Sequence, residues 1–209
     1  MTKFLVVFDV DSTLIEQEAI ELLAAHSESA DLVQQITDRA MRGEIDFSQS
    51  LIERVATLKG LPDSVLASVS SQLKLTKGAK ELVSEIHRRG GKVAAVSGGF
   101  IQLLDPIRTE LRLDFAAANT LGVEAGKLTG EVVGEIVNRQ AKAEYLIRWA
   151  KESGVEVSQT IAVGDGANDL GMMQVAGLSV AFCAKPIVND QADMVLANRD
   201  LAELISVLP

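Results

Sequence analysis

The chain has 209 residues, a net charge of −9 and 47% hydrophobic residues. This length accommodates one sizeable core, or a core with a small insert, and the apolar fraction is typical of a globular enzyme. The acidic residues are dispersed along the chain, which argues against nucleic acid and anionic membranes as partners. Aromatic residues make up only 4% of the sequence, too few for platforms that stack on bases.

The amino-terminal residues and the cysteine content indicate where the protein resides. Cys183 is the only cysteine, so no internal disulfide can form, which fits a reducing cytoplasm. The start, MTKFLVVFDVD, holds one lysine and a short apolar stretch that runs straight into aspartate. We therefore expect neither a signal peptide nor a membrane span. The sequence predicts a cytoplasmic protein and leaves its oligomeric state open.

Short apolar runs without clean alternation predict buried strands of a parallel sheet. They are residues 3–10, 92–98, 160–166 and 178–184. Helical patterns lie between them, such as residues 79–91 and 140–154, and each ends in basic or polar residues followed by glycine. Strands that alternate with helices predict an α/β, doubly wound, Rossmann-like fold with a mostly parallel sheet.

Residues 14–75 break this alternation, because they show helical periodicity without a convincing strand. Apolar residues fall on two helical stripes: Phe47, Leu51, Val55 and Leu58 in one, and Leu32, Val33, Ile36 and Ala40 in the other. We predict a small helical cap at 14–75, inserted into a catalytic core formed by 1–13 and 76–209. Residues 114–136 are rich in Gly, Val and Thr and predict a β-hairpin, for which the sequence indicates no role beyond scaffolding.

Asp9 and Asp11 stand two positions apart at the end of the first predicted strand. Side chains at this spacing point the same way in a strand, so the two charges repel each other, and burial strengthens the repulsion. A bound cation, a shared proton or a bend that separates the two residues would compensate.

Two more predicted strands end in residues suited to binding ions, and parallel sheets bind ligands at the carboxyl ends of their strands. These residues are Ser97, Gly98 and Gly99 at the end of one strand, and Asp165, Asn168 and Asp169 at the end of the other. The aspartates, taken with Asp9 and Asp11, cannot all be ionised at one edge without a cation. Oxygen ligands without cysteine or clustered histidine favour Mg²⁺ over zinc, because His26 and His87 lie on separate helical segments.

Two features predict a site for a phosphate group. The stretch SGGF, residues 97–100, can present backbone N–H groups to an anion, although alone it reads equally as a tight turn. Lys142 lies near the start of a predicted helix and would add positive charge, although most lysines are simply solvated. Residues 164–169, GDGAND, lack the third glycine of a dinucleotide fingerprint, and no P-loop motif occurs.

In this order, DVDST (9–13), SGG (97–99), Lys142 and GDGANDLGMM (164–173) resemble the four motifs of the haloacid dehalogenase superfamily of phosphotransferases. The helical insert after the first strand is similar to that superfamily's cap. Within the insert, residues 39–60 closely resemble the corresponding stretch of the phosphoserine phosphatase family. The resemblance implies a Mg²⁺-dependent phosphoric monoester hydrolase that acts on O-phospho-L-serine, in the last step of serine biosynthesis.

The insert contains two charged residues that suit an amino-acid substrate. Arg54 lies seven positions after Phe47, so both lie on the inward apolar stripe of one helix. An arginine there either snorkels to water or binds a ligand, and its planar fork suits a carboxylate. Glu18, at the edge of the first insert helix, would hold an ammonium group. Met41 and Phe47 would shield the site or, equally, pack within the cap.

The resemblance also implies a role for each motif residue. Asp9 is the nucleophile that forms an aspartyl phosphate, Asp11 is the proton donor and acceptor, and Thr13 helps to hold the turn after them. The implied metal ligands are the Asp9 and Asp165 side chains and the Asp11 backbone carbonyl, with Asp169 in support through water. The implied phosphoryl-binding residues are Ser97, Gly98 and Lys142, with Asn168 nearby.

Two alternative functions stay open on the sequence alone. The nearer one is another small-molecule phosphomonoesterase of the superfamily, acting on a phosphorylated amine, sugar or nucleotide. The further one is a non-enzymatic phospho-receiver domain, which also combines acids, a hydroxyl and a lysine on an α/β sheet. Receiver domains are shorter and lack a cap.

Overall fold

The computed structural model describes residues 2–209, apart from the side chain of Met41. The strands are β1 (Leu5–Phe8), β2 (Lys92–Phe100), β3 (Phe115–Glu124), β4 (Lys127–Val133), β5 (Thr160–Gly164), β6 (Leu178–Phe182) and β7 (Met194–Leu196). They form one sheet in the order β4-β3-β2-β1-β5-β6-β7, and of its neighbouring pairs β3–β4 is antiparallel and the others are parallel. The predicted mostly parallel α/β sheet is confirmed, and β7 is a short edge strand that the sequence patterns did not predict.

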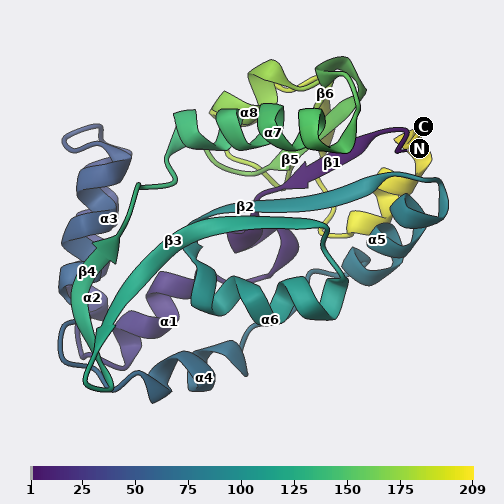
Figure 1. Cartoon of the computed structure of the whole chain (residues 1–209). Coiled ribbons are helices and arrows are strands. Elements are labelled where there is room, and N and C mark those ends of the chain that lie inside the picture. Colours follow the sequence, from purple (N-terminus) through teal and green to yellow (C-terminus); the bar gives the residue numbers. More distant parts are fainter. Residues whose placement is uncertain (1) are drawn as a thin grey trace.

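Helices cover both faces of this sheet. Successive side chains of β1 point to opposite faces, so each face of the strand packs against its own helix layer. Phe4, Val6 and Phe8 pack with α5 (Ala79–Arg88) and α6 (Ile101–Leu111). Leu5 and Val7 pack on the other side with α7 (Arg139–Ser153) and α8 (Leu170–Val175). Figure 1 shows these two helix layers on either side of the strands. The short helix α9 (Pro186–Asn189) follows β6 in the sequence. The central strand is therefore buried on both faces, as its unbroken apolar sequence predicts.

Helix α7 carries Lys142, and both of its ends are fixed by local sequence. The side chain of Asn138 accepts hydrogen bonds from the backbone N–H groups of Gln140 and Ala141, each at 3.0 Å. Gly154 ends the helix in the left-handed conformation, at φ 69°, which glycine adopts without steric penalty. This N-terminal cap sets where the helix begins, and Lys142 follows in its first turns.

Four helices lie within residues 14–75: α1 (Ala19–Ala25), α2 (Ala30–Met41), α3 (Phe47–Ala56) and α4 (Ser64–Ser70). Leu51, Val55 and Leu58 of the first predicted stripe are buried, as expected. The second stripe is partly wrong, because Leu32 is 49% exposed while its neighbour Val33 is buried. One residue step turns a helix by about 100°, so Val33 faces the inside and Leu32 faces solvent.

The predicted hairpin is present as β3 and β4, and it is an integral part of the main sheet. Strand β3 pairs in parallel with β2, through Phe115 opposite Ala94. The turn and β4 reach the cap, where the backbone N–H of Gly60 donates to the carbonyl of Leu128 at 2.9 Å and that of Leu128 donates to Leu61 at 2.8 Å. The hairpin therefore ties the cap helices to the sheet.

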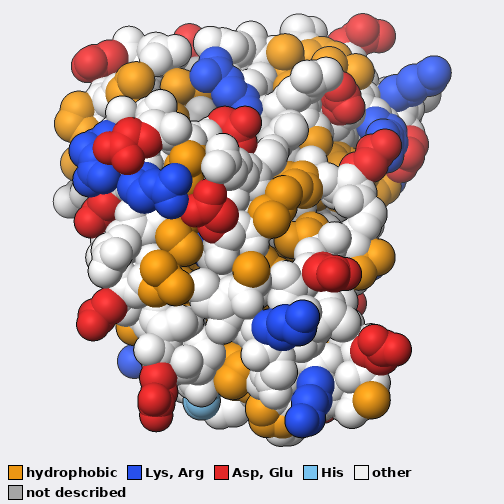
Figure 2. All heavy atoms as spheres, turned by 90° about the vertical axis from the view of Figure 1, so that its left-hand side faces the viewer, with side chains coloured by type: hydrophobic (Ala, Val, Ile, Leu, Met, Phe, Trp, Pro, Cys, Tyr) orange, Lys and Arg blue, Asp and Glu red, His pale blue; other side chains and the backbone are white. Residues whose placement is uncertain are grey.

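One apolar cluster joins the cap to the core. Leu58 and other cap side chains pack in it with Phe100 of β2 and Leu103 of α6, and with Leu121 and Leu128 of the hairpin. On the outer side, an ion pair at 2.7 Å joins Arg39 of α2 to Glu53 of α3. Figure 2 shows basic and acidic side chains beside one another on that side of the molecule. None of the helices in residues 2–209 has the length and apolar character needed to cross a bilayer.

The shared cluster predicts that the hairpin stabilises cap and core together. Leu128→Ala removes a buried side chain on β4 and should lower the free energy of unfolding by about 2–5 kcal/mol, measured by urea denaturation. Val133→Ala on the same strand is the control, because Val133 is 56% exposed and its loss should change stability by less than about 0.5 kcal/mol. Equal losses in the two variants would contradict this account of the cluster.

Candidate active site

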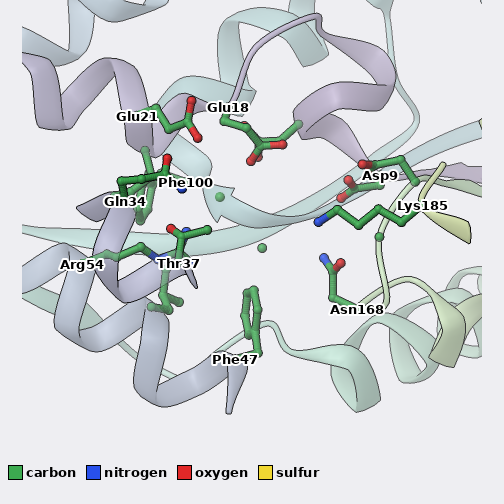
Figure 3. A pocket seen from close by; sticks show the side chains of 17 residues that line it. Asp9, Glu18, Glu21, Gln34, Thr37, Phe47, Arg54, Phe100, Asn168 and Lys185 are labelled. Carbon is green, nitrogen blue, oxygen red and sulfur yellow. The ribbon is translucent and has the colours of Figure 1, made fainter. Parts of the chain in front are cut away.

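A cavity of about 330 Å³ lies between the cap helices and the carboxyl ends of the strands. Its lining residues are Asp9, Asp11, Glu18, Ile20, Glu21, Gln34, Thr37, Phe47, Leu51, Arg54, Gly98, Gly99, Phe100, Asp165, Gly166, Asn168 and Lys185. In Figure 3, Arg54 and Lys185 extend into this cavity from opposite sides, and Glu18 lies between them. The cavity thus brings residues of the predicted cap together with residues from the ends of β1, β2 and β5.

Asp9 lies directly after β1 and is held in place by both backbone and side chain. Its N–H donates to the carbonyl of Val163 at 2.9 Å, which extends the pairing of β1 with β5 by one step. Lys142 donates to an Asp9 oxygen at 2.5 Å and to an Asp169 oxygen at 2.6 Å. All three side chains are buried, and Lys142 lies beneath the cavity wall, between the two carboxylates.

Asp169 shapes the loop that follows β5. Its second oxygen accepts hydrogen bonds from the N–H groups of Asp165 at 3.1 Å and Gly166 at 3.0 Å. Gly164 allows this close approach, since a Cβ at that position would lie 2.5 Å from Cγ of Asp169. The carboxylate of Asp169 therefore folds the loop back and presents Asp165 to the cavity.

These carboxylates carry more negative charge than Lys142 balances. Oxygens of Asp9, Asp165 and Asp169 lie within 4.8 Å of one another. Burial, and then the charge of Asp169, raise the pKa of Asp165 to about 7 and that of Asp9 well above its ordinary value. Burial alone would lower the pKa of Lys142, but the charges of Asp169 and Asp9 outweigh it and raise that pKa. Three clustered carboxylates offer the oxygen ligands that a hard divalent cation prefers, and such a cation would replace the protons that they hold without it.

Asp11 points away from these carboxylates, because the chain bends directly after β1. Its backbone is extended, at ψ 133°, and Ser12 adopts the left-handed conformation, at φ 58°. The Asp11 carboxylate accepts hydrogen bonds from the N–H of Ala19, at the start of α1, at 2.8 Å and from the hydroxyl of Ser97 at 3.2 Å. Burial, followed by the charge of Glu18, raises the pKa of Asp11 to about 6. The bend thus separates the two aspartates, and Asp11 faces the cap.

Residues Ser97–Gly99 lie inside β2, which extends two residues beyond the strand predicted at 92–98. The strand continues to Phe100, and its pairing with β3 shifts register between Val96 and Phe100. Gly98 lines the cavity against Phe47, because a Cβ on Gly98 would lie 2.6 Å from Cζ of that ring. Ser97 is buried beside Asp11 and is not among the residues that line the main cavity.

The described cap residues predicted to bind substrate all lie on the cavity wall. Arg54 is half-buried, its Nε donates to the carbonyl of Ser50 at 3.2 Å, and burial lowers its pKa. Glu18 accepts a hydrogen bond from the hydroxyl of Ser12 at 2.7 Å. Phe47 closes the cavity opposite Glu18, as Figure 3 shows. The predicted role of Met41 concerns a side chain outside the described residues.

Sequence reasoning missed Lys185, which lines the cavity on the core side. Its backbone N–H donates to the carbonyl of Asp165 at 3.1 Å, and among the described residues its ammonium forms no ion pair. The signal was available, since Lys185 follows the strand predicted at 178–184 at the same sheet edge. The predicted role of Thr13 is not supported by hydrogen bonding, because its buried hydroxyl has no partner in residues 2–209.

Comparison with known proteins identifies the family. A family model described as haloacid dehalogenase-like hydrolase matches residues 5–177, most of the chain. The chain belongs to this family of hydrolases. Its cap helices and its family membership together exclude the receiver-domain alternative.

Individual relatives narrow the resemblance further. The phosphoserine phosphatase of Streptococcus thermophilus is 52% identical over 206 residues, which cover 99% of this chain and 96% of that protein. The phosphoserine phosphatase of Streptomyces coelicolor is 55% identical over 188 residues, and there the match covers 90% of this chain but only 46% of the longer relative. A solved structure of a phospho-aspartyl intermediate analogue of phosphoserine phosphatase superposes with a TM-score of 0.94 at 44% identity, and it covers 100% of both chains. The resemblance to phosphoserine phosphatases is confirmed.

Proposed function

We infer that the chain hydrolyses O-phospho-L-serine to L-serine and inorganic phosphate, the last step of serine biosynthesis. The observation that carries this inference is one cavity with a buried aspartate on the core side and a Glu18–Arg54 pair on the cap side. A carboxylate and a guanidinium on one wall complement the ammonium and carboxylate groups of an amino acid. The similarity to full-length phosphoserine phosphatases supports the same substrate.

In the proposed mechanism, the reaction has two displacements at phosphorus. A carboxylate oxygen of Asp9 attacks the phosphoryl group, the bond from phosphorus to the serine oxygen breaks, and Asp11 gives its proton to that oxygen. Asp11 then takes a proton from water, whose oxygen attacks the aspartyl phosphate and releases phosphate with Asp9 restored. A pKa of about 6 suits Asp11 to both directions of proton transfer near neutral pH.

Mg²⁺ is the proposed cofactor, held by the side chains of Asp9 and Asp165 and the backbone carbonyl of Asp11. When bound, it neutralises the carboxylates and stabilises negative charge on the transferring phosphoryl group. Asp169 supports this site through the loop that it folds, and a water-mediated contact of Asp169 is part of the proposal.

The remaining predicted residues position the substrate in this proposal. Ser97, Gly98 and Lys142 bind the phosphoryl oxygens, with Asn168 at the edge of the cavity. Lys185, which has no partner charge among the described residues, draws the phosphate dianion into an acidic cavity. Phe47, and Met41 by resemblance, shield the bound substrate from bulk water. We place the enzyme in the cytoplasm, on the basis of its single half-buried thiol and its biosynthetic relatives.

The nucleophile is tested by Asp9→Asn, which replaces the attacking carboxylate by an amide. This variant should lose phosphate release from phosphoserine, measured with Mg²⁺ present, and should form no acid-labile phosphoenzyme. Asp105→Asn is the matched control, since Asp105 is an exposed aspartate of α6 and its replacement should leave turnover unchanged. Retained turnover in Asp9→Asn would disprove the nucleophile assignment.

The raised carboxyl pKa values predict a pH-dependent affinity for Mg²⁺. The folded, metal-free protein holds protons more tightly than the unfolded chain, so its stability falls as pH rises from about 4 towards about 7. Mg²⁺ must displace the proton of Asp165, so its affinity should rise between about pH 6 and pH 8 and then level off. Calorimetric titration should show proton release near pH 6.5 that Asp165→Asn reduces, while the raised pKa of Asp9 leaves a remaining share. An affinity independent of pH would contradict these raised pKa values.

Arg54→Ala tests the amino-acid clamp. It should raise KM for phosphoserine about 10- to 100-fold, because a charged hydrogen-bonded pair with the substrate carboxylate contributes about 1.5–3 kcal/mol. The activity towards an aryl phosphate without a carboxylate should change little. Arg39→Ala is the control, because Arg39 pairs with Glu53 on the outer side of the cap. Equal losses for both substrates would make Arg54 a structural residue and favour another phosphomonoesterase activity.

A further inference from the structure

Asn119, in the middle of β3, makes three side-chain hydrogen bonds that no part of the proposed mechanism uses. Its Nδ2 donates to the carbonyl of Gly98 at 2.8 Å and to that of Gly99 at 3.3 Å. Its Oδ1 accepts from the N–H of Val137 at 2.8 Å. The side chain is buried, with the residue only 1% exposed. The amide matches this position, which needs a donor and an acceptor together, and neither aspartate nor leucine offers both.

We propose that Asn119 is a positioning residue for the phosphoryl site, which holds the Ser97–Gly99 segment of β2 in its binding conformation. The argument begins with peptide geometry, since the C=O and N–H of a trans peptide unit point in opposite directions. Asn119 draws the carbonyl of Gly98 towards β3, so the N–H of Gly99 in the same peptide unit faces the other way. There it donates to the hydroxyl of Ser97 at 2.7 Å.

The effect of this contact reaches the proton donor. With the Gly99 N–H on one lone pair of the Ser97 oxygen, the direction of the Ser97 O–H is restricted, and this hydroxyl donates to Asp11 at 3.2 Å. A continuous chain of hydrogen bonds therefore runs from Asn119 through the Gly98–Gly99 peptide and Ser97 to Asp11. It sets the orientation of two groups that the proposed mechanism assigns to phosphate binding and proton transfer.

The acceptor side of Asn119 reaches a second element of the site. Val137 directly precedes Asn138, the residue that caps α7, and the N–H of Lys142 donates to the carbonyl of Asn138 at 3.0 Å. The Asn119 amide thus links the Ser97–Gly99 segment of β2 to the start of the helix that carries Lys142. The hairpin, for which the sequence indicated only scaffolding, sets the relative position of both phosphoryl-binding elements.

The test compares two amides that bind the same strand. Gln102 of α6 brackets Leu121 of β3, with its Nε2 donating to the carbonyl at 2.8 Å and its Oε1 accepting from the N–H at 3.2 Å. Gln102→Ala therefore removes a similar pair of side-chain hydrogen bonds at a position that does not touch the Ser97–Gly99 segment. Asn119→Ala is the test variant, and Asn119→Ser, which keeps a small polar group at this buried position, repeats the test if the alanine variant fails to fold.

Inorganic phosphate is the probe, measured as a competitive inhibitor of aryl phosphate hydrolysis by the Mg²⁺-loaded enzyme. Asn119→Ala or Asn119→Ser should raise the inhibition constant for phosphate about 10- to 100-fold, as expected when a supporting partner of a bound group is lost. Gln102→Ala should shift it less than about twofold at a temperature where thermal unfolding shows each variant folded. Phosphate inhibition in the Asn119 variants equal to that in Gln102→Ala would overturn the proposal, and Asn119 would then be merely structural.

This inference rests on the proposed phosphate-binding role of the Ser97–Gly99 segment, so Ser97→Ala is measured in parallel. If Ser97→Ala weakens phosphate inhibition and the Asn119 variants do not, the positioning role alone fails. An unchanged inhibition constant in Ser97→Ala would overturn both the phosphate-binding role of the Ser97–Gly99 segment and the positioning role of Asn119. The choice of an aryl phosphate keeps the test independent of phosphoserine, so an error in the substrate assignment would not mimic either result.

Discussion

The buried contact of Lys142 with Asp9 and Asp169 is the interaction on which the rest of the site depends. A lone ammonium or carboxylate at this depth would be strongly destabilising, and removal of one partner from a buried ion pair costs about 3–5 kcal/mol. One lysine nevertheless cannot neutralise Asp9, Asp165 and Asp169 together, and burial, followed by the charge of Asp169, raises the pKa values of Asp9 and Asp165. The fold therefore creates a cluster of carboxylates whose remaining negative charge is neutralised by bound protons or by a cation.

The topology of the sheet makes this arrangement possible. Strand β1 lies in the centre of the sheet, with β2 on one side and β5 on the other. The loops that follow these neighbouring strands therefore diverge at the carboxyl end of β1 and leave a crevice there. Asp9 and Lys142 are 133 positions apart in the sequence, yet they meet because α7 packs on the face of β1. The same divergence leaves room for the cap, which enters and leaves the core between β1 and β2.

The parts of this site that sequence predicts are those set by local rules. Hydrophobic periodicity, strand ends and glycine-rich stretches identify Asp9, Asp165 and the Ser97–Gly99 segment, because each of these signals depends on only a few adjacent residues. The role of Asn119 is invisible at that level, since its partners lie 18 to 21 positions away and its own surroundings read as an ordinary strand. The register shift in β2 and the exposure of Leu32 are likewise decided by which elements pack together.

The bend after β1 links chemistry to substrate recognition. The N–H of Ala19 holds the carboxylate of Asp11, and the hydroxyl of Ser12 holds that of Glu18, so residues 11–19 form one hydrogen-bonded unit at the base of the cap. If Glu18 and Asp11 have the roles proposed above, a displacement of α1 would move the acceptor of the substrate amine and the proton donor together. In that mechanism, the acid would align with the leaving oxygen only when the cap sits correctly on the substrate. Selection of the amino-acid group and protonation of its oxygen then depend on the same contacts.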